Sequence, residues 1–172
     1  SKDYAVYLDM GYNHPDRYAL TVLSNILGGS MSSRLFQSVR EKSGLAYSIY
    51  SSPSFYRDTG AIMIYAGMSK ENYDQTLDCV NNELNALLAH GVSTEEFDRS
   101  RRQLRGNIII NLEGSSAWAN WLGRQFIYNT GLHDIDQIEE KLNLLSLDDL
   151  LRVGADLFNK RREVSVSLGG LN

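Results

Sequence analysis

The sequence has few of the residues that indicate a disulfide scaffold, a membrane anchor or a metal site. Cys79 is the only cysteine among 172 residues, which excludes an internal disulfide and fits a reducing compartment. No apolar run approaches the roughly 20 residues of a membrane-spanning helix, and the start shows no signal-peptide pattern. The length instead predicts one globular domain, since a chain of this size buries roughly 70% of its unfolded surface.

Excess positive charge is also lacking. The chain carries 17 basic and 21 acidic residues, a net charge of −4, which argues against a general nucleic-acid binder. The exception is a local basic cluster at residues 99–105, which could be a binding patch or a solvated helix face. Acidic residues interleave with it at helical spacing, and this favours the solvated face. The cluster comprises Arg99, Arg101, Arg102 and Arg105, with Glu95, Glu96 and Asp98 among them.

Histidine is scarce as well. A hydrolytic zinc site needs three protein ligands, an open coordination position and a nearby carboxylate base. The three histidines, His14, His90 and His133, are far apart in the sequence and are expected at helix caps, helix ends or loops. We therefore predict no metal site in this chain. Gly28, Gly29 and Ser30 lack the lysine of a phosphate-binding loop and are interpreted as a helix terminator.

Four segments have the patterns of strands. Residues 4–12 alternate in polarity, and residues 46–56 are rich in β-forming side chains, with Pro53 suggesting an edge position, a bulge or a break. Residues 61–68 are apolar on both faces, which predicts a central strand covered on both sides or nearly so. Residues 163–169 should close the sheet, with Val164, Val166 and Leu168 facing inside.

Helix starts are marked by side chains that can accept the unpaired N–H groups of a first turn. Residues 13–16, with a capping asparagine, predict a helix running to Leu27, and Ser69 is predicted to cap a helix that ends near Gly91. Capping boxes are expected at Ser93 with Glu96, Asp134 with Gln137, and Ser146 with Asp149. A break at residues 114–116 precedes a helix lined by Trp118, Trp121, Leu122 and Phe126. This order predicts an α+β fold, with a mainly antiparallel or mixed sheet and helices packed on one face.

The remaining segment, residues 27–50, organises the rest. Ser32 or Ser33 can cap a helix with an apolar stripe of Leu35, Phe36 and Val39, and Gly44 then supplies a left-handed cap. Arg40 is thus expected on the last helical turn and Tyr47 at the start of the next strand. By themselves these positions need no function, because the helix dipole favours a terminal arginine and tyrosine suits a strand.

The stretch GGSMSSRLFQSVREKSGLAYSIYS, residues 28–51, resembles the start of the zinc-free second domain of the pitrilysin and mitochondrial-processing-peptidase family. The resemblance covers nearly the whole chain, and the spacing of Arg40, Gly44 and Tyr47 is its most specific part. It implies that residues 1–172 are the C-terminal half of a larger two-domain zinc endopeptidase. The start at Ser1, without a methionine, agrees with a processed or excised piece.

The resemblance also implies roles and partners. Zinc would be bound by the N-terminal domain of the same protein through the inverzincin motif H-x-x-E-H, which this chain lacks, so the chain alone should be inactive. Tyr47 would donate to the substrate carbonyl and Arg40 would contact the backbone of unfolded peptide substrates. The short loop at residues 28–31 points to a bacterial, cytoplasmic protein rather than one of the mitochondrial matrix. A homo-oligomer through the partner-facing surface is expected, and the alternative is a non-catalytic structural or binding subunit.

Overall fold

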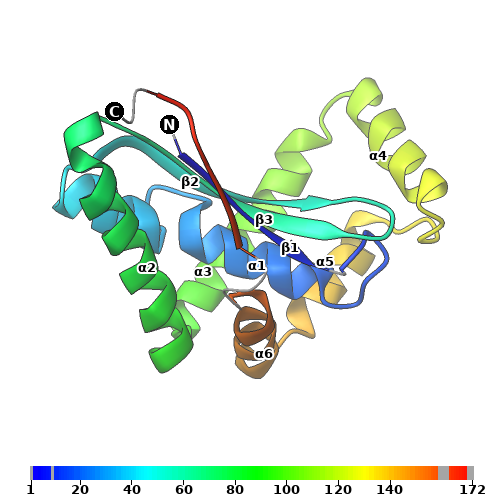
Figure 1. The fold of residues 1–172 in the computed structure, drawn as a ribbon. Helices are drawn as coiled ribbons and strands as arrows, with labels where there is room; N and C mark the ends of the chain where they lie inside the picture. Colours follow the sequence, from blue (N-terminus) through cyan, green and yellow to red (C-terminus); the bar gives the residue numbers. More distant parts are fainter. Residues whose placement is uncertain (1, 9, 159–162, 170–172) are drawn as a thin grey trace.

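The computed structural model describes residues 2–8, 10–158 and 163–169, and within these ranges four strands form one antiparallel sheet (Figure 1). The order across the sheet is β2-β3-β1-β4, and each neighbouring pair is antiparallel. The strands are β1 (Lys2–Leu8), β2 (Ala46–Phe55), β3 (Gly60–Met68) and β4 (Glu163–Ser167). The predicted α+β class is confirmed, β3 is central, and Pro53 lies on an edge strand as expected.

The helices gather on one side of this sheet, except for α4, which projects from the body of the molecule (Figure 1). They are α1 (Arg17–Gly28), α2 (Tyr73–His90), α3 (Thr94–Asn111), α4 (Ser115–Ile127), α5 (Ile135–Asn143) and α6 (Leu147–Leu157), with a π-helical segment η1 (Phe36–Lys42) and a 3-10 turn η2 (Lys70–Asn72). No helix in the described part of the chain is both long and apolar enough to span a bilayer.

Helix α1 is the centre of the core. Its Leu20, Leu23 and Leu27 are fully buried, and the helix packs against β2, α3 and α6. Ile62 and Ile64 of β3 belong to the same buried cluster. Each such side chain contributes roughly 1.5–3 kcal/mol on burial, so this helix and the central strand hold the layers together. Cys79 is partly buried and packs at the edge of this core.

Two predictions about strands are wrong. Strand β1 ends at Leu8, whereas the alternation predicted a strand to residue 12. The N–H of Tyr12 donates instead to the carbonyl of Tyr56, and a Cβ on Gly11 would lie 2.4 Å from the carbonyl oxygen of Arg57. The segment therefore runs close against the tip of the β2–β3 hairpin. Residue 9 lies outside the described residues.

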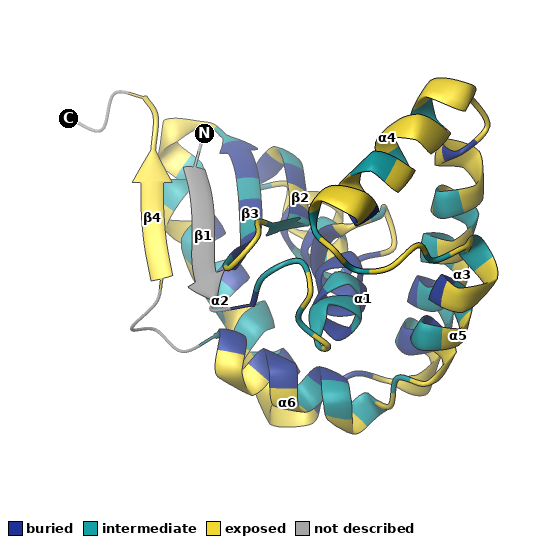
Figure 2. Ribbon diagram, turned by 90° about the vertical axis from the view of Figure 1, so that its right-hand side faces the viewer, coloured by how far each residue is buried: buried dark blue, intermediate teal, exposed yellow. Residues whose placement is uncertain are grey.

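The second error concerns β4. Val164, Val166 and Leu168 were expected inside, yet all three are exposed, as are the remaining residues of the strand (Figure 2). Strand β4 lies at the sheet edge and pairs with β1. Alternating polarity gives a strand one apolar face, but that face is buried only where another element covers it. The covering of β3 is likewise incomplete, since Met63 and Tyr65 on its outer face are only partly buried.

The three predicted capping boxes are confirmed, at Ser93, Asp134 and Ser146. Two other predicted starts need correction. The Asn13 side chain donates to the carbonyl of Tyr128 rather than capping α1, because tertiary contacts compete with local ones. Ser69 precedes the 3-10 turn η2, so α2 begins only at Tyr73, and no side-chain cap bond forms at Ser69.

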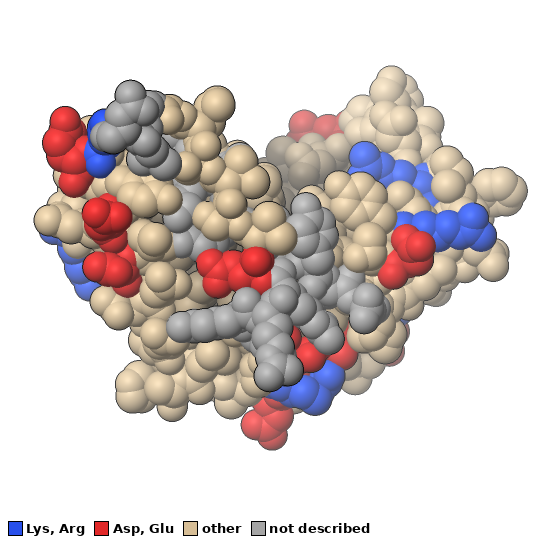
Figure 3. Space-filling view, viewed as in Figure 1, with Lys and Arg blue, Asp and Glu red and all other residues tan. Residues whose placement is uncertain are grey.

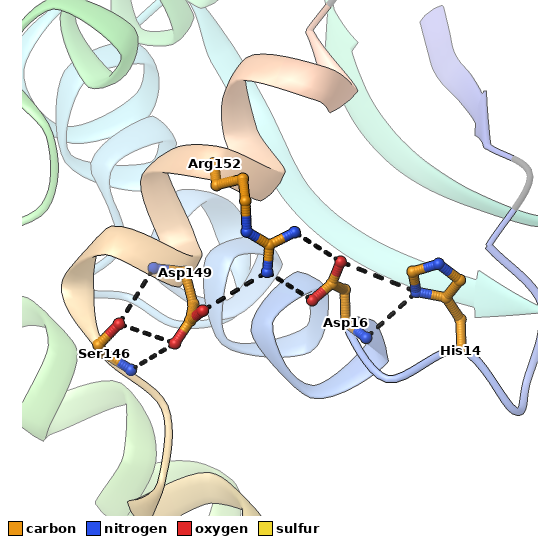
Figure 4. Close-up of polar contacts among 5 residues, drawn as sticks. All are labelled: His14, Asp16, Ser146, Asp149 and Arg152. Atoms are coloured by element: carbon orange, nitrogen blue, oxygen red, sulfur yellow. Dashed lines mark hydrogen bonds and ion pairs between the residues drawn. The ribbon is translucent and has the colours of Figure 1, made fainter.

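A polar network joins the start of α1 to α6 (Figure 4). Arg152 donates to both carboxylate oxygens of Asp16, at 2.8 and 2.7 Å, and this lowers the pKa of Asp16 from its usual value. His14 accepts the N–H of Asp16 through Nδ1, so it lies in the cap region as predicted. The network ties two helices together at their exposed ends.

Charged side chains of both signs are scattered over the face shown in Figure 3, which is hollowed between the end carrying α2 and the end carrying α4. The basic cluster on α3 is largely paired with acids, as predicted for a solvated face. Its ion pairs join Arg99 to Glu95, Arg101 to Asp98 and Arg105 to Glu139.

Candidate functional site

The candidate site lies where η1 meets β2. The sequence predicted a helix here, and the structure gives a π-helical segment whose buried side is formed by Leu35 and Val39. The predicted serine cap is absent, since the Ser33 hydroxyl donates to the carbonyl of Ser30 and the segment has no side-chain cap bond. π-Helical turns are rare and occur frequently at functional sites.

Gly44 ends η1 as predicted, with φ at +61°. The N–H of Gly44 donates to the carbonyl of Arg40 at 3.1 Å, and the N–H of Leu45 donates to the carbonyl of Val39 at 2.9 Å. Hydrogen bonds of this kind satisfy the last carbonyls of a helix and turn the chain sharply. They fix the backbone of Arg40 six residues before Ala46, where β2 begins.

Arg40 lies on the last turn of η1, as predicted, and its side chain is exposed. Its guanidinium carbon lies 4.8 Å from the ring centroid of Phe36, which is a cation–π distance. Among the described residues the Arg40 side chain has no hydrogen-bond or ion-pair partner. Its donors are therefore available to a ligand.

Tyr47 stands on a β-bulge. The pairing of β2 with β3 shifts between Ala46 and Ser48, so Tyr47 is the extra residue on the bulged strand. Its side chain is 66% exposed, and its hydroxyl has no hydrogen-bond partner among the described residues. Bulges re-aim side chains and are over-represented next to active sites. The structure thus brings Arg40 and Tyr47 to one junction, on either side of the turn at Gly44.

Two neighbours of Tyr47 were missed by the sequence analysis. A Cβ on Gly67 would lie 2.5 Å from Cε2 of Tyr47, so the absence of a side chain there makes room for the ring. Tyr50 stacks on Tyr65 with centroids 5.0 Å apart. Both partners lie on β3, and only the cross-strand register could have identified them.

A salt bridge braces the start of this segment. Arg34 donates Nε and a terminal N–H to the two carboxylate oxygens of Glu96, at 2.7 and 2.8 Å, and also donates to the carbonyl of Gly91. The hydrogen bonds from Arg34 lower the pKa of Glu96 to about 2. This pair joins the approach to η1 to the start of α3, and the sequence analysis did not foresee it.

The residues present do not form a zinc site. His14 lies before α1, His90 ends α2 and His133 precedes α5, which are the caps, ends and loops predicted for them. In the described part of the chain, no three His, Cys, Asp or Glu side chains lie together as metal ligands would. The described residues therefore offer no site at which a metal could act.

Comparison with known proteins identifies relatives. Residues 4–104 match the model of the family described as "Peptidase M16 inactive domain". An uncharacterized zinc protease of Bacillus subtilis, YmxG, is 35% identical over 147 residues, which are 86% of this chain and 36% of the relative. The chain thus spans about a third of the length of that relative.

Solved structures share the fold. A protease from Helicobacter pylori superposes with a TM-score of 0.84 at 22% identity, covering 95% of this chain and 40% of that one. The inactive peptidase domain of a Bordetella parapertussis protein superposes with a TM-score of 0.78 at 15% identity, covering 96% of this chain and 90% of that one. That Bordetella chain is little longer than the matched segment, so a chain of about this length adopts the fold by itself.

Proposed function

This chain belongs to the peptidase M16 family as its inactive domain, and we propose that it completes the substrate chamber of a zinc endopeptidase. In this proposal Arg40 and Tyr47 contact the backbone of an extended peptide at the metal site of a preceding domain. The observation that carries it is that two exposed side chains flank the turn at Gly44, and neither has a hydrogen-bond or ion-pair partner among the described residues.

The chemistry of the two side chains suits this role. Hydrolysis of a peptide bond builds negative charge on the scissile carbonyl oxygen, and a phenolic O–H placed at that oxygen stabilises it. The planar guanidinium of Arg40 can hold a neighbouring backbone carbonyl or a carboxylate through paired donors. Tyr47 would therefore act mainly on the transition state, and Arg40 would also bind the ground state.

Zinc belongs, in this proposal, to the N-terminal domain of the same protein. The B. subtilis relative is named a zinc protease and is nearly three times the length of the matched segment, which leaves room for such a domain. Because that relative is bacterial, we place the protein in bacteria, in the cytoplasm. This domain by itself should not cleave peptides, since its described residues offer no set of metal ligands.

Site-specific photocrosslinking in the full-length protein tests the contact directly. Benzoylphenylalanine at position 47 should crosslink to an unfolded peptide substrate. It should not crosslink to a folded protein, even when that protein is added in excess. Tyr56, just beyond the far end of β2 and 56% exposed, provides the matched control and should give no crosslink. Equal crosslinking at both positions, or none at position 47, would favour a non-catalytic structural role.

A further inference from the structure

A cavity of about 550 Å³ opens between the start of α1 and the loop that leads from α4 into α5. Basic side chains from distant parts of the sequence line it, and none of the described lining residues carries a carboxylate. These basic residues are His14, Arg17, His133 and Lys141. Its size lies within the range of small-ligand sites. It is remote in sequence from the junction of Arg40 and Tyr47.

Arg17 forms one wall of this cavity. Its guanidinium carbon lies 4.4 Å from the ring centroid of Tyr12 and 4.6 Å from that of Tyr18. It donates one hydrogen bond to the carbonyl of Tyr12 and one to the hydroxyl of Tyr18, at 2.7 and 2.6 Å. Arginine has five N–H donors, so three remain. The two rings hold these donors in place before any ligand arrives.

Lys141 supplies the second fixed charge. Its Nζ lies 3.0 Å from Nε2 of His133, which accepts because an ammonium group can only donate. Two N–H donors of Lys141 remain. The nearby acid, Asp16, is held by Arg152 in the network of Figure 4. Among the described residues neither Arg17 nor Lys141 has a carboxylate partner.

A second basic hollow differs from this cavity, because carboxylates line it and pair with its arginines. The hollow of about 150 Å³ between α3 and α5 is lined by three arginines, but Asp98 and Glu139 line it too. Two of those arginines form ion pairs with these acids. Positive charge is thus neutralised there and left uncompensated in the cavity of Arg17 and Lys141.

An apolar hollow of about 390 Å³ adjoins the cavity across the wall of Tyr12, Arg17 and Tyr18. Ile108 and Trp121 are among its apolar lining residues, and Asn107 and Asn111 lie at its margin, exposed. A peptide backbone offers N–H and C=O groups that can pair with these amides, whereas an aliphatic chain offers none.

We propose that the two hollows together bind the C-terminal carboxylate of a peptide whose last residue is apolar. The carboxylate pairs with Arg17 and Lys141, and the last side chain packs against Trp121 and Ile108. Asn107 and Asn111 accept and donate to the peptide backbone. Charge-assisted hydrogen bonds of this kind are stronger than neutral ones, so the free carboxylate should dominate recognition. The site does not depend on Arg40 or Tyr47.

Isothermal titration of the chain 1–172 with acetyl-Ala-Ala-Phe, as the free acid and as the C-terminal amide, tests this proposal. The acid should bind at least tenfold more tightly than the amide. Decanoate distinguishes the other source of a carboxylate with an apolar arm and should bind more weakly than the peptide acid. Equal binding of acid and amide, or tighter binding of decanoate, would overturn the assignment.

Variants locate the site. Lys141→Gln should remove most of the preference for the acid, and Lys141→Arg, which keeps the charge, should restore it. Arg102→Gln removes a charge from the paired hollow on α3 and is the matched control, with no expected change. If Lys141→Gln retains the preference while its thermal unfolding matches that of the parent chain, the carboxylate binds elsewhere and the proposal fails.

Discussion

At the scale of single residues, Glu96 joins the approach to the candidate site to the helix behind it. Its carboxylate accepts from Arg34 and from the N–H of Ser93, so one side chain closes both a salt bridge and a capping box. The side chains of Arg34 and Glu96 are only 18% and 20% exposed. The hydrogen bonds from Arg34 lower the pKa of Glu96 to about 2, although burial of the carboxylate acts in the opposite direction.

The pair makes stability depend on pH. The pKa of Glu96 is lower in the folded state than its ordinary value of 4.5, so the stabilisation from this carboxylate is present above about pH 4.5 and is lost as the pH falls toward 2. Glu96→Gln should lower the free energy of unfolding by about 2–3 kcal/mol at pH 7 and by much less at pH 3. Urea unfolding at both pH values measures this.

Glu95→Gln is the control for that experiment. Glu95 is next in the chain but 86% exposed, and its closest approach to Arg99 is 3.7 Å. Exposed pairs of this kind contribute about 0–1 kcal/mol, so this variant should unfold almost as the parent does. If both variants lose the same stability, or if the loss from Glu96→Gln does not change with pH, the salt bridge is not the brace described here.

At the scale of elements, the exit from η1 depends on Gly44. Its φ of +61° is a conformation that other residues rarely adopt, while a Cβ there would meet no atom within 4 Å. Gly44→Ala should therefore destabilise the chain by about 1–2 kcal/mol through backbone strain alone. Thermal or urea unfolding of the chain 1–172 measures the change.

Gly106 offers a control of opposite sign. It lies inside α3, and a Cβ there also meets nothing within 4 Å. Gly106→Ala should stabilise the chain by about 0.5–1 kcal/mol, because alanine favours a helix interior. A stabilising Gly44→Ala would show that the left-handed cap is not what turns the chain between Arg40 and Tyr47.

Features that depend only on residues close together in the sequence were predicted correctly. The three capping boxes and the Gly44 cap were each predictable, because their hydrogen bonds join residues a few positions apart. The π-helical form of η1 and the bulge at Tyr47 were not, because no residue type distinguishes them locally from an α-helix and a regular strand. The exposure of β4 depends on which elements cover the sheet, and this is a property of the whole fold.

At the scale of the whole molecule, the sequence located one candidate site and missed the other. Arg40 and Tyr47 are seven residues apart, on either side of the cap at Gly44, so their spacing in the sequence is enough to predict that they lie near one another. The cavity of Arg17 and Lys141 joins residues more than 120 positions apart. Only the packing of α5 beside α1 reveals that their charges face one space.

The arrangement of helices and sheet explains why the junction of Arg40 and Tyr47 is exposed rather than buried. Helices cover the inner face of the sheet (Figure 1), whereas Tyr47 packs over Gly67 on the opposite face, where Tyr50 and Tyr65 stack and burial is partial. A Cβ on Gly67 would collide with the Tyr47 ring rather than with backbone. The position of the phenol ring is therefore set by the sheet, and its hydroxyl has no hydrogen-bond partner among the described residues.

Steady-state kinetics of Tyr47→Phe in the full-length protein, with a fluorogenic peptide, tests the central claim most directly. The change keeps the ring and removes one donor to the developing oxyanion, so kcat should fall on the order of 10²–10³-fold, about 3–4 kcal/mol of transition-state stabilisation. KM and the melting temperature should change little. Tyr50→Phe, in the stacked pair with Tyr65, is the matched control and should leave kcat unchanged. An unaltered kcat with a lowered melting temperature for Tyr47→Phe would contradict the account, because the tyrosine would then serve the fold and not the reaction.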